Sequence, residues 1–371
     1  MATDSESRRA FGELIALLEE IDDRYLGDEW SAAAFGDVHD GYRSVVHTLE
    51  GALALTFESD AERPSFRPIV TPTRKMLGDN PDALYYTAPV RADRAYRVTG
   101  NLAGAVYLSF TIEKGTDEGG YSTQTAGVLR DADFDVGTDG SFEVFFGGSE
   151  RASNWLGLPD GASEIIVRCY FEETQPAAAD PNRRVPLTID LLDPVGPPAP
   201  WSDASVAAGI RNVSRFLRNR TLEQPKPGER EQPTWVSTTP NVFPPPEMPG
   251  EFAFAAFDAA YSMAPYLLAP DEALVMRGRW PDCRFANVSL WNRYLQTYDY
   301  AHRPAGRNRA NTQLEPDGTF RIVVAHEDPR VPNWIDTEGR GFGMVFWRFF
   351  VPEGDIETPQ AEVVELADLR G

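Results

Sequence analysis

The feature that most constrains the fold of this chain is a phrase that occurs twice, at the same distance from a preceding landmark. The string DGSFEVFF begins at Asp139, and the related string DGTFRIVV begins at Asp317. Each aspartate stands 39 residues after a glycine, Gly100 in the first case and Gly278 in the second. Agreement at this spacing predicts that one structural unit occurs twice in the chain.

Two further landmarks follow in both copies. An Asn-Trp pair places Trp155 55 residues after the first glycine and Trp334 56 residues after the second. An arginine follows each tryptophan by 13 or 14 residues, at Arg168 and Arg348. Because both copies carry the Asn-Trp pair, it is typical of a structural corner in which the indole fills the end of a sheet. A doubled β-unit would also supply its own packing partner.

Short strands with alternating apolar and polar residues fill the copies. Residues 88–172 contain AYRVTG, AVYLSFTI, SFEVFF and EIIVRCYF, separated by Gly, Asp and Asn turns, which is typical of antiparallel sheets. We therefore predict a mainly β fold with added helices (α+β), built from two internally duplicated antiparallel β-sandwich or jelly-roll-like units. The first β repeat is expected at 63–195 and the second at 251–371.

Helices are expected outside the two repeats. We predict an N-terminal helical segment at 1–62, a helix within 196–222, and an extended Pro-rich linker at 223–250. Apolar residues at helical spacing predict the buried stripes of the first two helices. These stripes are Phe11, Leu14, Ile15, Leu18 and Ile21 in one helix, and Val38, Tyr42, Val45, Leu49, Leu53 and Phe57 in the next.

Charge and composition exclude several classes of function. A net charge of −22 and a pI near 4.6 would repel nucleic acid and anionic membrane surfaces. No run is apolar enough for a secretory leader or a spanning helix, and two cysteines are too few for a disulfide framework, so we expect a cytoplasmic protein with no membrane partner. Familiar nucleotide, zinc and serine-hydrolase strings are absent, so no cofactor and no metal is predicted, although a calcium site in an Asp-rich turn stays open.

The second copy is richer in reactive side chains than the first, in the stretch AHEDPRVPNWIDTEGRG. If the strand ending at His326 and the turn at 335–341 share one end of a sheet, an imidazole and carboxylates converge beside an indole, as acid/base chemistry requires. A solvated acidic turn with a surface histidine is the alternative. The predicted catalytic residues are His326, Asp336 and Glu338, and the predicted substrate-binding residues are Trp334, Arg348 and Arg340.

Two other groups of charged residues can be interpreted as structural or as functional. His39 and His47 are expected to be helix-surface groups paired with acids, because their spacing does not suit joint metal ligation. Arg303, Arg307 and Arg309 form the one strongly basic stretch of the sequence. It would suit recognition of a carboxylate or phosphate, but we favour contact with the acidic surface of another subunit.

The segments GDNPDALYYTAPV and NWIDTEGRGFGMVFWRFF, together with the twofold Asn-Trp, resemble a bacterial family known as domain of unknown function 1214, which often accompanies domain 1254. The resemblance covers most of residues 63–355 and is strongest after Asp271. It implies a mostly β architecture with helical additions. It brings no agreed activity, and therefore no catalytic residues to transfer.

Three hypotheses of function follow, and the sequence leaves open whether the protein is an enzyme. The first is acid/base chemistry on a small organic molecule, sugar- or lipid-derived, held against Trp334 in the second unit. The second is a non-catalytic module with an aromatic-lined pocket for an apolar ligand. The third is an architectural homo-oligomer joined through the Arg303–Arg309 stretch.

Overall fold

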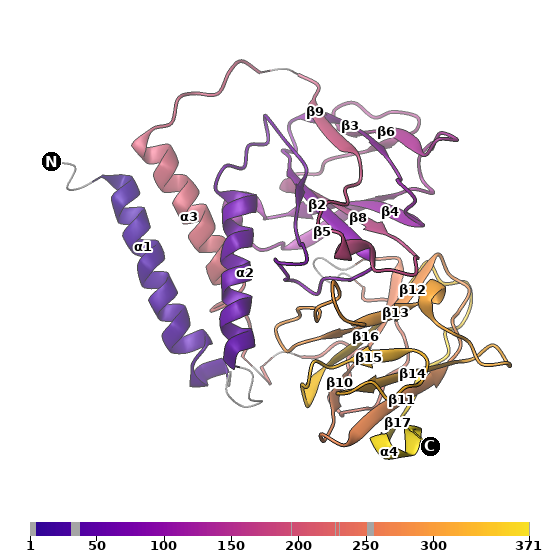
Figure 1. The fold of residues 1–371 in the computed structure, drawn as a ribbon. Coiled ribbons are helices and arrows are strands. Elements are labelled where there is room, and N and C mark those ends of the chain that lie inside the picture. Colours follow the sequence, from indigo (N-terminus) through magenta and orange to yellow (C-terminus); the bar gives the residue numbers. More distant parts are fainter. Residues whose placement is uncertain are drawn as a thin grey trace.

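The computed structural model describes residues 5–30, 38–193, 195–226, 228–229, 231–250 and 256–370. These residues form a layer of helices beside two stacked β-units, with the first unit above the second in Figure 1. The prediction of a mainly β fold with an N-terminal helical pair and a mid-chain helix is confirmed. Every helix in these ranges is too short or too polar to cross a lipid bilayer.

The helical layer has α3 as its common element. The Ser202 side chain caps α3 by accepting a hydrogen bond from Ser205 N. The Ser205 hydroxyl accepts a hydrogen bond from Ser202 N, which completes a capping box. Both α1 and α2 pack against α3, and α1 ends in a π turn at Ile21–Tyr25 (Figure 1). The helices are α1 (Glu6–Glu20), α2 (Val38–Thr56), α3 (Asp203–Asn219) and the short α4 (Leu366–Leu369), with 3-10 turns at Asp28–Trp30, Asp117–Gly119, Ala177–Ala179 and Arg309–Asn311.

The predicted stripes of the first two helices are partly wrong. Phe11 and Tyr42, both expected to be buried, are 57% and 49% exposed. The buried face of α2 includes several small residues, because neighbouring side chains approach the helix closely. A methyl group on Gly41 would lie 2.8 Å from the Tyr294 hydroxyl, and one on Gly51 would lie 2.4 Å from the end of Met76. The hydrophobicity of Phe11 and Tyr42 therefore led to a wrong prediction that their side chains are buried. The other exposed members of the stripes are Ile15, Val38 and Leu53.

The first β-unit is a sandwich of two sheets. One sheet has the strand order β1-β2-β8-β4-β5, and the other has the order β7-β6-β3-β9. Side chains from both sheets, such as Phe110 and Val144, form one buried core between them. The strands are β1 (Arg67–Pro68), β2 (Ala83–Pro89), β3 (Ala95–Asn101), β4 (Tyr107–Lys114), β5 (Gln124–Arg130), β6 (Ser141–Gly147), β7 (Trp155–Leu156), β8 (Ala162–Tyr170) and β9 (Leu187–Leu191).

The second unit repeats this arrangement strand for strand, apart from β1. Its sheets have the orders β10-β16-β12-β13 and β15-β14-β11-β17, and its core again lies between the sheets, around Val288 and Ile322. The strands are β10 (Ala259–Leu267), β11 (Glu272–Gly278), β12 (Phe285–Trp291), β13 (Gly306–Asn308), β14 (Phe320–Ala325), β15 (Trp334–Asp336), β16 (Phe342–Phe350) and β17 (Gln360–Glu365).

Strand register also agrees between the units. Arg168 in β8 stands opposite Ser109 in β4, just as Arg348 in β16 stands opposite Asn287 in β12. In each unit the short strand that carries the tryptophan runs parallel to its neighbour, whereas the other named strand pairs of the described residues are antiparallel. The landmarks that recur in the sequence therefore occupy equivalent places in two sandwiches of the same topology.

The Asn-Trp pairs form matching corners. Asn154 and Asn333 adopt left-handed backbone conformations, with φ of 54° and 60°. Their side-chain oxygens accept hydrogen bonds from the backbone N–H groups of Asp135 and Gln313. Each following indole N–H donates to a backbone carbonyl at the end of the neighbouring strand. Asparagine suits this position because its short amide tolerates positive φ and bonds locally.

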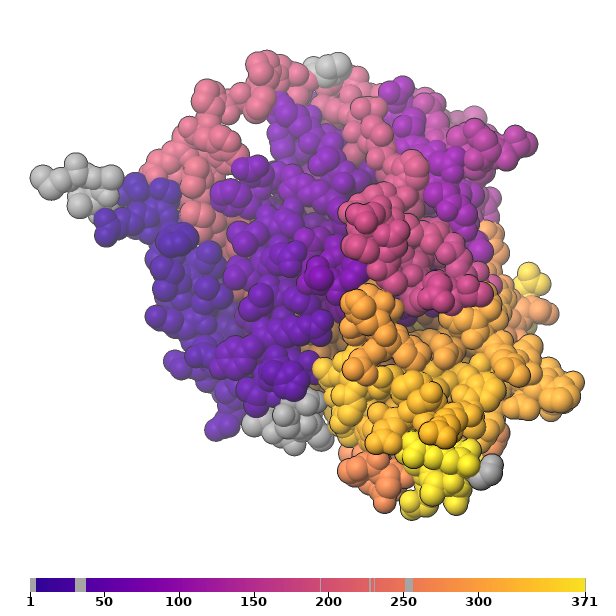
Figure 2. Space-filling view, in the orientation of Figure 1, coloured from indigo at the N-terminus to yellow at the C-terminus, as the bar shows by residue number. Residues whose placement is uncertain are grey.

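Polar side chains and aromatic rings join the two units. The segment Gly78–Asp82 crosses from one to the other: Asn80 and Asp82 accept hydrogen bonds from Asn287 of β12 at 2.7 and 2.9 Å. Beside them, Tyr107 and Tyr170 of the first unit pack on Phe350 of the second. The α2 surface lies against the second unit as well, which Figure 2 shows where purple meets yellow. Helices and both units thus form one packed body.

Candidate functional site

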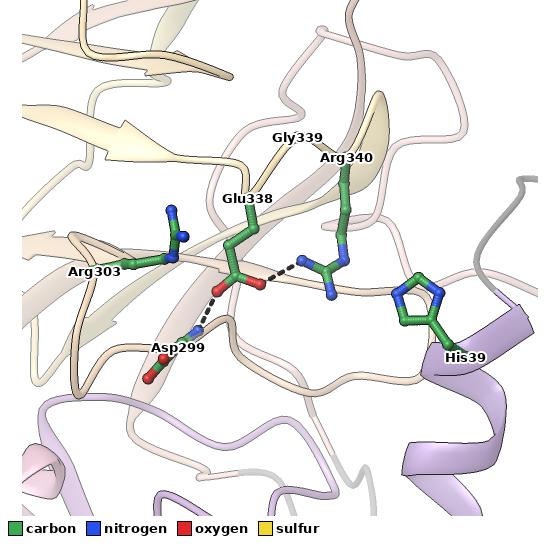
Figure 3. Close-up of a pocket in the computed structure, with 6 residues that line it drawn as sticks. All are labelled: His39, Asp299, Arg303, Glu338, Gly339 and Arg340. Carbon is green, nitrogen blue, oxygen red and sulfur yellow. Dashed lines mark hydrogen bonds and ion pairs between the residues drawn. The ribbon is translucent and has the colours of Figure 1, made fainter.

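A cleft of about 390 Å³ lies where α2 meets the second β-unit (Figure 3). One wall comes from the N-terminal end of α2. The other walls come from the 292–305 loop between β12 and β13 and from the 337–341 turn between β15 and β16. The residues that line the cleft are His39, Asp299, Arg303, Glu338, Gly339 and Arg340.

The turn before β16 places two charged residues in the cleft. Glu338 and Gly339 have positive φ values of 55° and 77°, so the chain reverses sharply. The Asp336 carboxylate stabilises this reversal by accepting a hydrogen bond from Glu338 N at 2.7 Å. Arg340 N closes the turn on Thr337 O. As a result, both side chains project from one short turn into the cleft, Glu338 toward Asp299 and Arg340 toward the side of His39 (Figure 3).

Each of the three nitrogens of the Arg340 guanidinium donates a hydrogen bond to a carboxylate of the protein. It donates to both oxygens of Asp40 at 2.8 and 3.0 Å and also to Glu338. Its planar group lies 4.8 Å from the centre of the Tyr298 ring. Burial opposes its charge, but the hydrogen bonds and charges of these carboxylates raise the pKa of Arg340 above its ordinary value. Arg340 therefore shapes the cleft and ties α2 to the second unit.

Arg303 is the more available cation. One of its terminal nitrogens donates to Asp336 at 2.6 Å, while the side chain remains 52% exposed. Within the described ranges, this is the one side-chain partner that the Arg303 guanidinium has. The pKa of Arg303 is raised by the hydrogen bond to Asp336. Its remaining N–H donors can bind a guest in the cleft, and a guanidinium fork fits a carboxylate or phosphate group.

Asp299 forms the floor beside Glu338. Its backbone N–H donates to Glu338 Oε1 at 2.5 Å, and its carboxylate lies 2.9 Å from His302 Nδ1. Burial acts to raise the pKa of Asp299, but the hydrogen bond and charge of His302 outweigh it and lower the pKa overall. The cleft thus combines cationic donors with carboxylates that are already held by neighbouring groups.

The structure brings three of the six predicted site residues to this cleft. Glu338 and Arg340 line it, and Asp336 lies behind it as the partner of Arg303. The other three lie elsewhere. The His326 ring bonds Thr337 Oγ1 at 2.6 Å and has no carboxylate partner among the described residues. Trp334 donates its indole N–H to Ala325 O at 3.1 Å.

Arg348 lies at the junction between the units, apart from the cleft lining. It is 3% exposed, donates to Gly78 O at 2.8 Å, and lies over the rings of Trp291 and Phe346. These contacts hold the Gly78–Asp82 segment against β16. The structure therefore gives Arg348 a place in the packing of the units.

Sequence reasoning missed His39, Asp299 and Arg303 as members of the cleft. The expectation that His39 lies on a helix surface beside an acid is confirmed, since its side chain is 73% exposed and its ring lies 4.0 Å from the Asp40 carboxylate. Within the chain, Arg303, Arg307 and Arg309 bond Asp336, Trp334 O and Glu172, and their contact with another subunit stays a prediction. The surface position expected for His47 is wrong, because this residue is 8% exposed and its ring accepts a hydrogen bond from Lys75 N. No local pattern signals that the start of α2 meets the 292–305 loop.

Comparison with known proteins places most of this cleft within one family segment. Residues 282–354 match DUF1214, a protein family of unknown function. The resemblance predicted from the sequence is confirmed for this segment. The DUF1214 segment runs from just before β12 to just past β16, and it contains every lining residue of the cleft except His39. No curated protein matches the chain.

One solved structure resembles the chain over nearly its whole length. A protein of uncharacterised function from Burkholderia cenocepacia is 26% identical, with a TM-score of 0.80, and the match covers 97% of both chains. The VPA0106 protein from Vibrio parahaemolyticus is 11% identical with a TM-score of 0.49, covering 87% of this chain and 98% of that one. The first of these shows that the helical layer and both β-units occur together in another protein.

Proposed function

We propose that the protein binds a small organic anion in the cleft between α2 and the DUF1214 segment. The observation that carries this proposal is the state of Arg303, whose exposed guanidinium faces the cleft with donors to spare, whereas neighbouring Arg340 is occupied by Asp40 and Glu338. A carboxylate or phosphate group would complete the hydrogen bonds of Arg303. Asp299 and Glu338 would accept hydrogen bonds from hydroxyl or amino groups on the same molecule.

The polarity of the cleft argues for a hydrophilic guest. Its lining contains three cationic or titratable nitrogen-bearing side chains and two carboxylates, with glycine as the remaining member. The hypothesis of a guest held against Trp334 has less support, because the Trp334 indole donates to a strand-end carbonyl and packs on a hydrophobic cluster. A small, polar, negatively charged metabolite fits the arrangement better than an apolar ligand.

Acid/base catalysis at the same cleft is a second candidate function. The pair His302–Asp299, at 2.9 Å, supports it, since a carboxylate can orient an imidazole for proton transfer. The predicted role of Glu338 stays a prediction within this scheme, and the roles of His326 and Asp336 gain no geometric support. A His302→Gln variant that binds the guest normally but no longer transforms it would establish catalysis, and unchanged turnover would exclude this pair.

Two broader parts of the proposal concern the cellular compartment of the protein and the origin of its two β-units. We place the protein in the cytoplasm, supported by its acidic composition and by Cys169 and Cys283 being free thiols. We also propose that the two units arose by internal duplication, supported by their equal strand order and register. The longer β12–β13 loop of the second unit then accounts for a cleft there, because the corresponding 115–123 segment is shorter.

The binding proposal can be tested by calorimetry with succinate and inorganic phosphate as probes. Loss of a charge-assisted hydrogen bond costs roughly 1.5–3 kcal/mol, so Arg303→Gln should weaken binding of the preferred anion about tenfold or more. The two probes separate carboxylate from phosphate recognition. If neither anion binds with a millimolar or tighter constant, or if Arg303→Gln binds as well as the wild type, the proposal is wrong.

Arg284→Gln provides a matched control for this experiment. Arg284 is 44% exposed and pairs at 2.7 Å with Asp131, whose side chain is 6% exposed, much as Arg303 pairs with nearly buried Asp336. Both substitutions leave a buried carboxylate without its cation, so they disturb stability in similar ways. Because Arg284 lies outside the cleft lining, its loss should leave anion affinity unchanged.

A further inference from the structure

We propose that buried Lys75 is a positioning residue for the cleft, holding the 297–300 segment, and with it Asp299, from behind. This inference rests on the proposed anion site, because Asp299 and Glu338 are the groups it would position. Lys75 is itself absent from the cleft lining. Its side chain is 1% exposed, which is rare for a lysine unless the charge has a purpose and a set of partners.

The Lys75 ammonium group contacts the residues that precede and follow Asp299 in the chain. Nζ donates to Thr297 O at 3.0 Å and to Tyr298 O, and it lies 3.9 Å from the centre of the Tyr300 ring. The residues on both sides of Asp299 are therefore fixed by one cation. Asp299 in turn donates its backbone N–H to Glu338 and pairs its carboxylate with His302.

A second buried ionisable side chain, that of Asp79, holds the same segment. Asp79 is 2% exposed and accepts hydrogen bonds from Thr297 N at 2.8 Å and from the Thr297 hydroxyl. Burial lowers the pKa of Lys75 to about 8, and the charges of Asp79, Asp299 and Glu338 act against that effect. Because the pKa remains above neutrality, Lys75 is mainly cationic at pH 7. Its charge in turn acts to lower the pKa of Asp299.

The backbone of Lys75 extends the same connection to α2. Lys75 N donates to His47 Nδ1 at 3.1 Å, and Gln296 Nε2 donates to Lys75 O at 2.7 Å. Lys75 thus joins the helix that carries His39 to the loop that carries Asp299. Lys75 therefore fixes two walls of the cleft relative to each other without touching a ligand, as outer-shell residues do in other binding sites.

A purely structural role for Lys75 would lower stability without changing the cleft, so the test needs a local measurement. In the full chain, Lys75→Met should speed amide hydrogen exchange in residues 298–303 and weaken anion binding about tenfold or more, as loss of outer-shell support does. Succinate and inorganic phosphate serve as the probes. Lys114→Met is the matched control, because that half-buried lysine lies in β4 and has no side-chain partner among the described residues.

The outcomes separate this inference from the proposed function. Normal exchange and normal affinity in a folded Lys75→Met variant overturn the positioning role. If Arg303→Gln has no effect on binding, the anion site fails, and the exchange data alone then decide whether Lys75 fixes the loop. Should Lys75→Met not fold, Lys75→Gln, which is polar but has no ammonium group, takes its place and should show the same faster exchange and weaker binding. Failure of both variants to fold would show a role in global stability and would also overturn the inference.

Discussion

Arg340 and Asp40 form a two-point ion pair between residues 300 positions apart in the chain. The Asp40 side chain is 1% exposed and that of Arg340 is 11% exposed, so the pair is nearly sealed from water. It fastens the first turn of α2 to the turn before β16. The wall that α2 contributes to the cleft therefore depends on a contact that only the folded chain can make.

Removing the charge of Asp40 should be costly. In Asp40→Asn, a nearly buried Arg340 would retain Glu338 as its one ionic partner among the described residues, and breaking a buried pair costs about 3–5 kcal/mol. Urea unfolding should show a loss of stability of this order. The exposed pair Arg91–Asp93 provides the control, and Asp93→Asn should leave the urea midpoint unchanged. Equal effects of the two substitutions would contradict the importance assigned to the buried pair.

His47 should make stability depend on acid pH. Burial, with the charge of Arg43, lowers the pKa of His47 from 6.5 to about 4. A lowered histidine pKa means that the unfolded chain takes up the proton first, so stability is full above pH 6.5 and falls as the pH drops toward 4. The loss is at most roughly 3 kcal/mol. His47→Asn retains an acceptor for Lys75 N but does not titrate, so its melting temperature should fall less between pH 7 and pH 5.

The two Asn-Trp corners should contribute differently to the free energy of unfolding. Asn333 makes three side-chain hydrogen bonds, to both backbone groups of Gln313 and to Arg321 O. Within the part of the chain that the structure describes, Asn154 makes one such bond, accepting from Asp135 N. Alanine at either position would also face a positive φ. Because a net hydrogen bond contributes about 1 kcal/mol, Asn333→Ala should lose roughly 2 kcal/mol more stability than Asn154→Ala in urea unfolding. A reversed order would show that backbone strain, and not the side-chain bonds, decides the cost.

Two glutamates in the first unit, buried Glu113 and half-buried Glu164, should change stability with pH in the direction opposite to His47. Glu113 and Glu164 stand opposite each other on β4 and β8, and burial raises the pKa of both. Raised carboxyl pKa values favour the protonated folded state, so their contribution is full below about pH 4.5 and declines as the pH rises. Glu164→Gln should therefore gain stability relative to wild type between pH 4 and pH 8. Exposed Glu143→Gln should show no such trend.

Much of the fold could be predicted because its signals are local or periodic. Strand alternation, turn residues and the recurrence of Trp155 and Trp334 at matching distances are all visible in one dimension. The expectation that only the later copy carries special residues was too simple. At the positions of Glu113 and Glu164, the second unit has Trp291 and Met344, so on this face the first unit is the more polar.

The candidate site could be predicted only in part, for a physical reason. Asp336, Glu338 and Arg340 belong to one turn, and their nearness follows from sequence. His39 and Arg303 reach the same cleft through tertiary packing, which no spacing along the chain encodes. Lys75 gave no signal in the sequence, because its role depends on burial between α2 and the 292–305 loop.

The ion pair of Arg340 and Asp40 also bears on how the protein assembles during synthesis. Residue 40 leaves the ribosome long before residue 340 has been made, while the first β-unit can already complete its own core. Until then α2 lacks its ionic partner and the walls supplied by the second unit. Its exposed start would be open to chaperones or to mispairing during this interval, and the cleft can form only after residue 340 has been made.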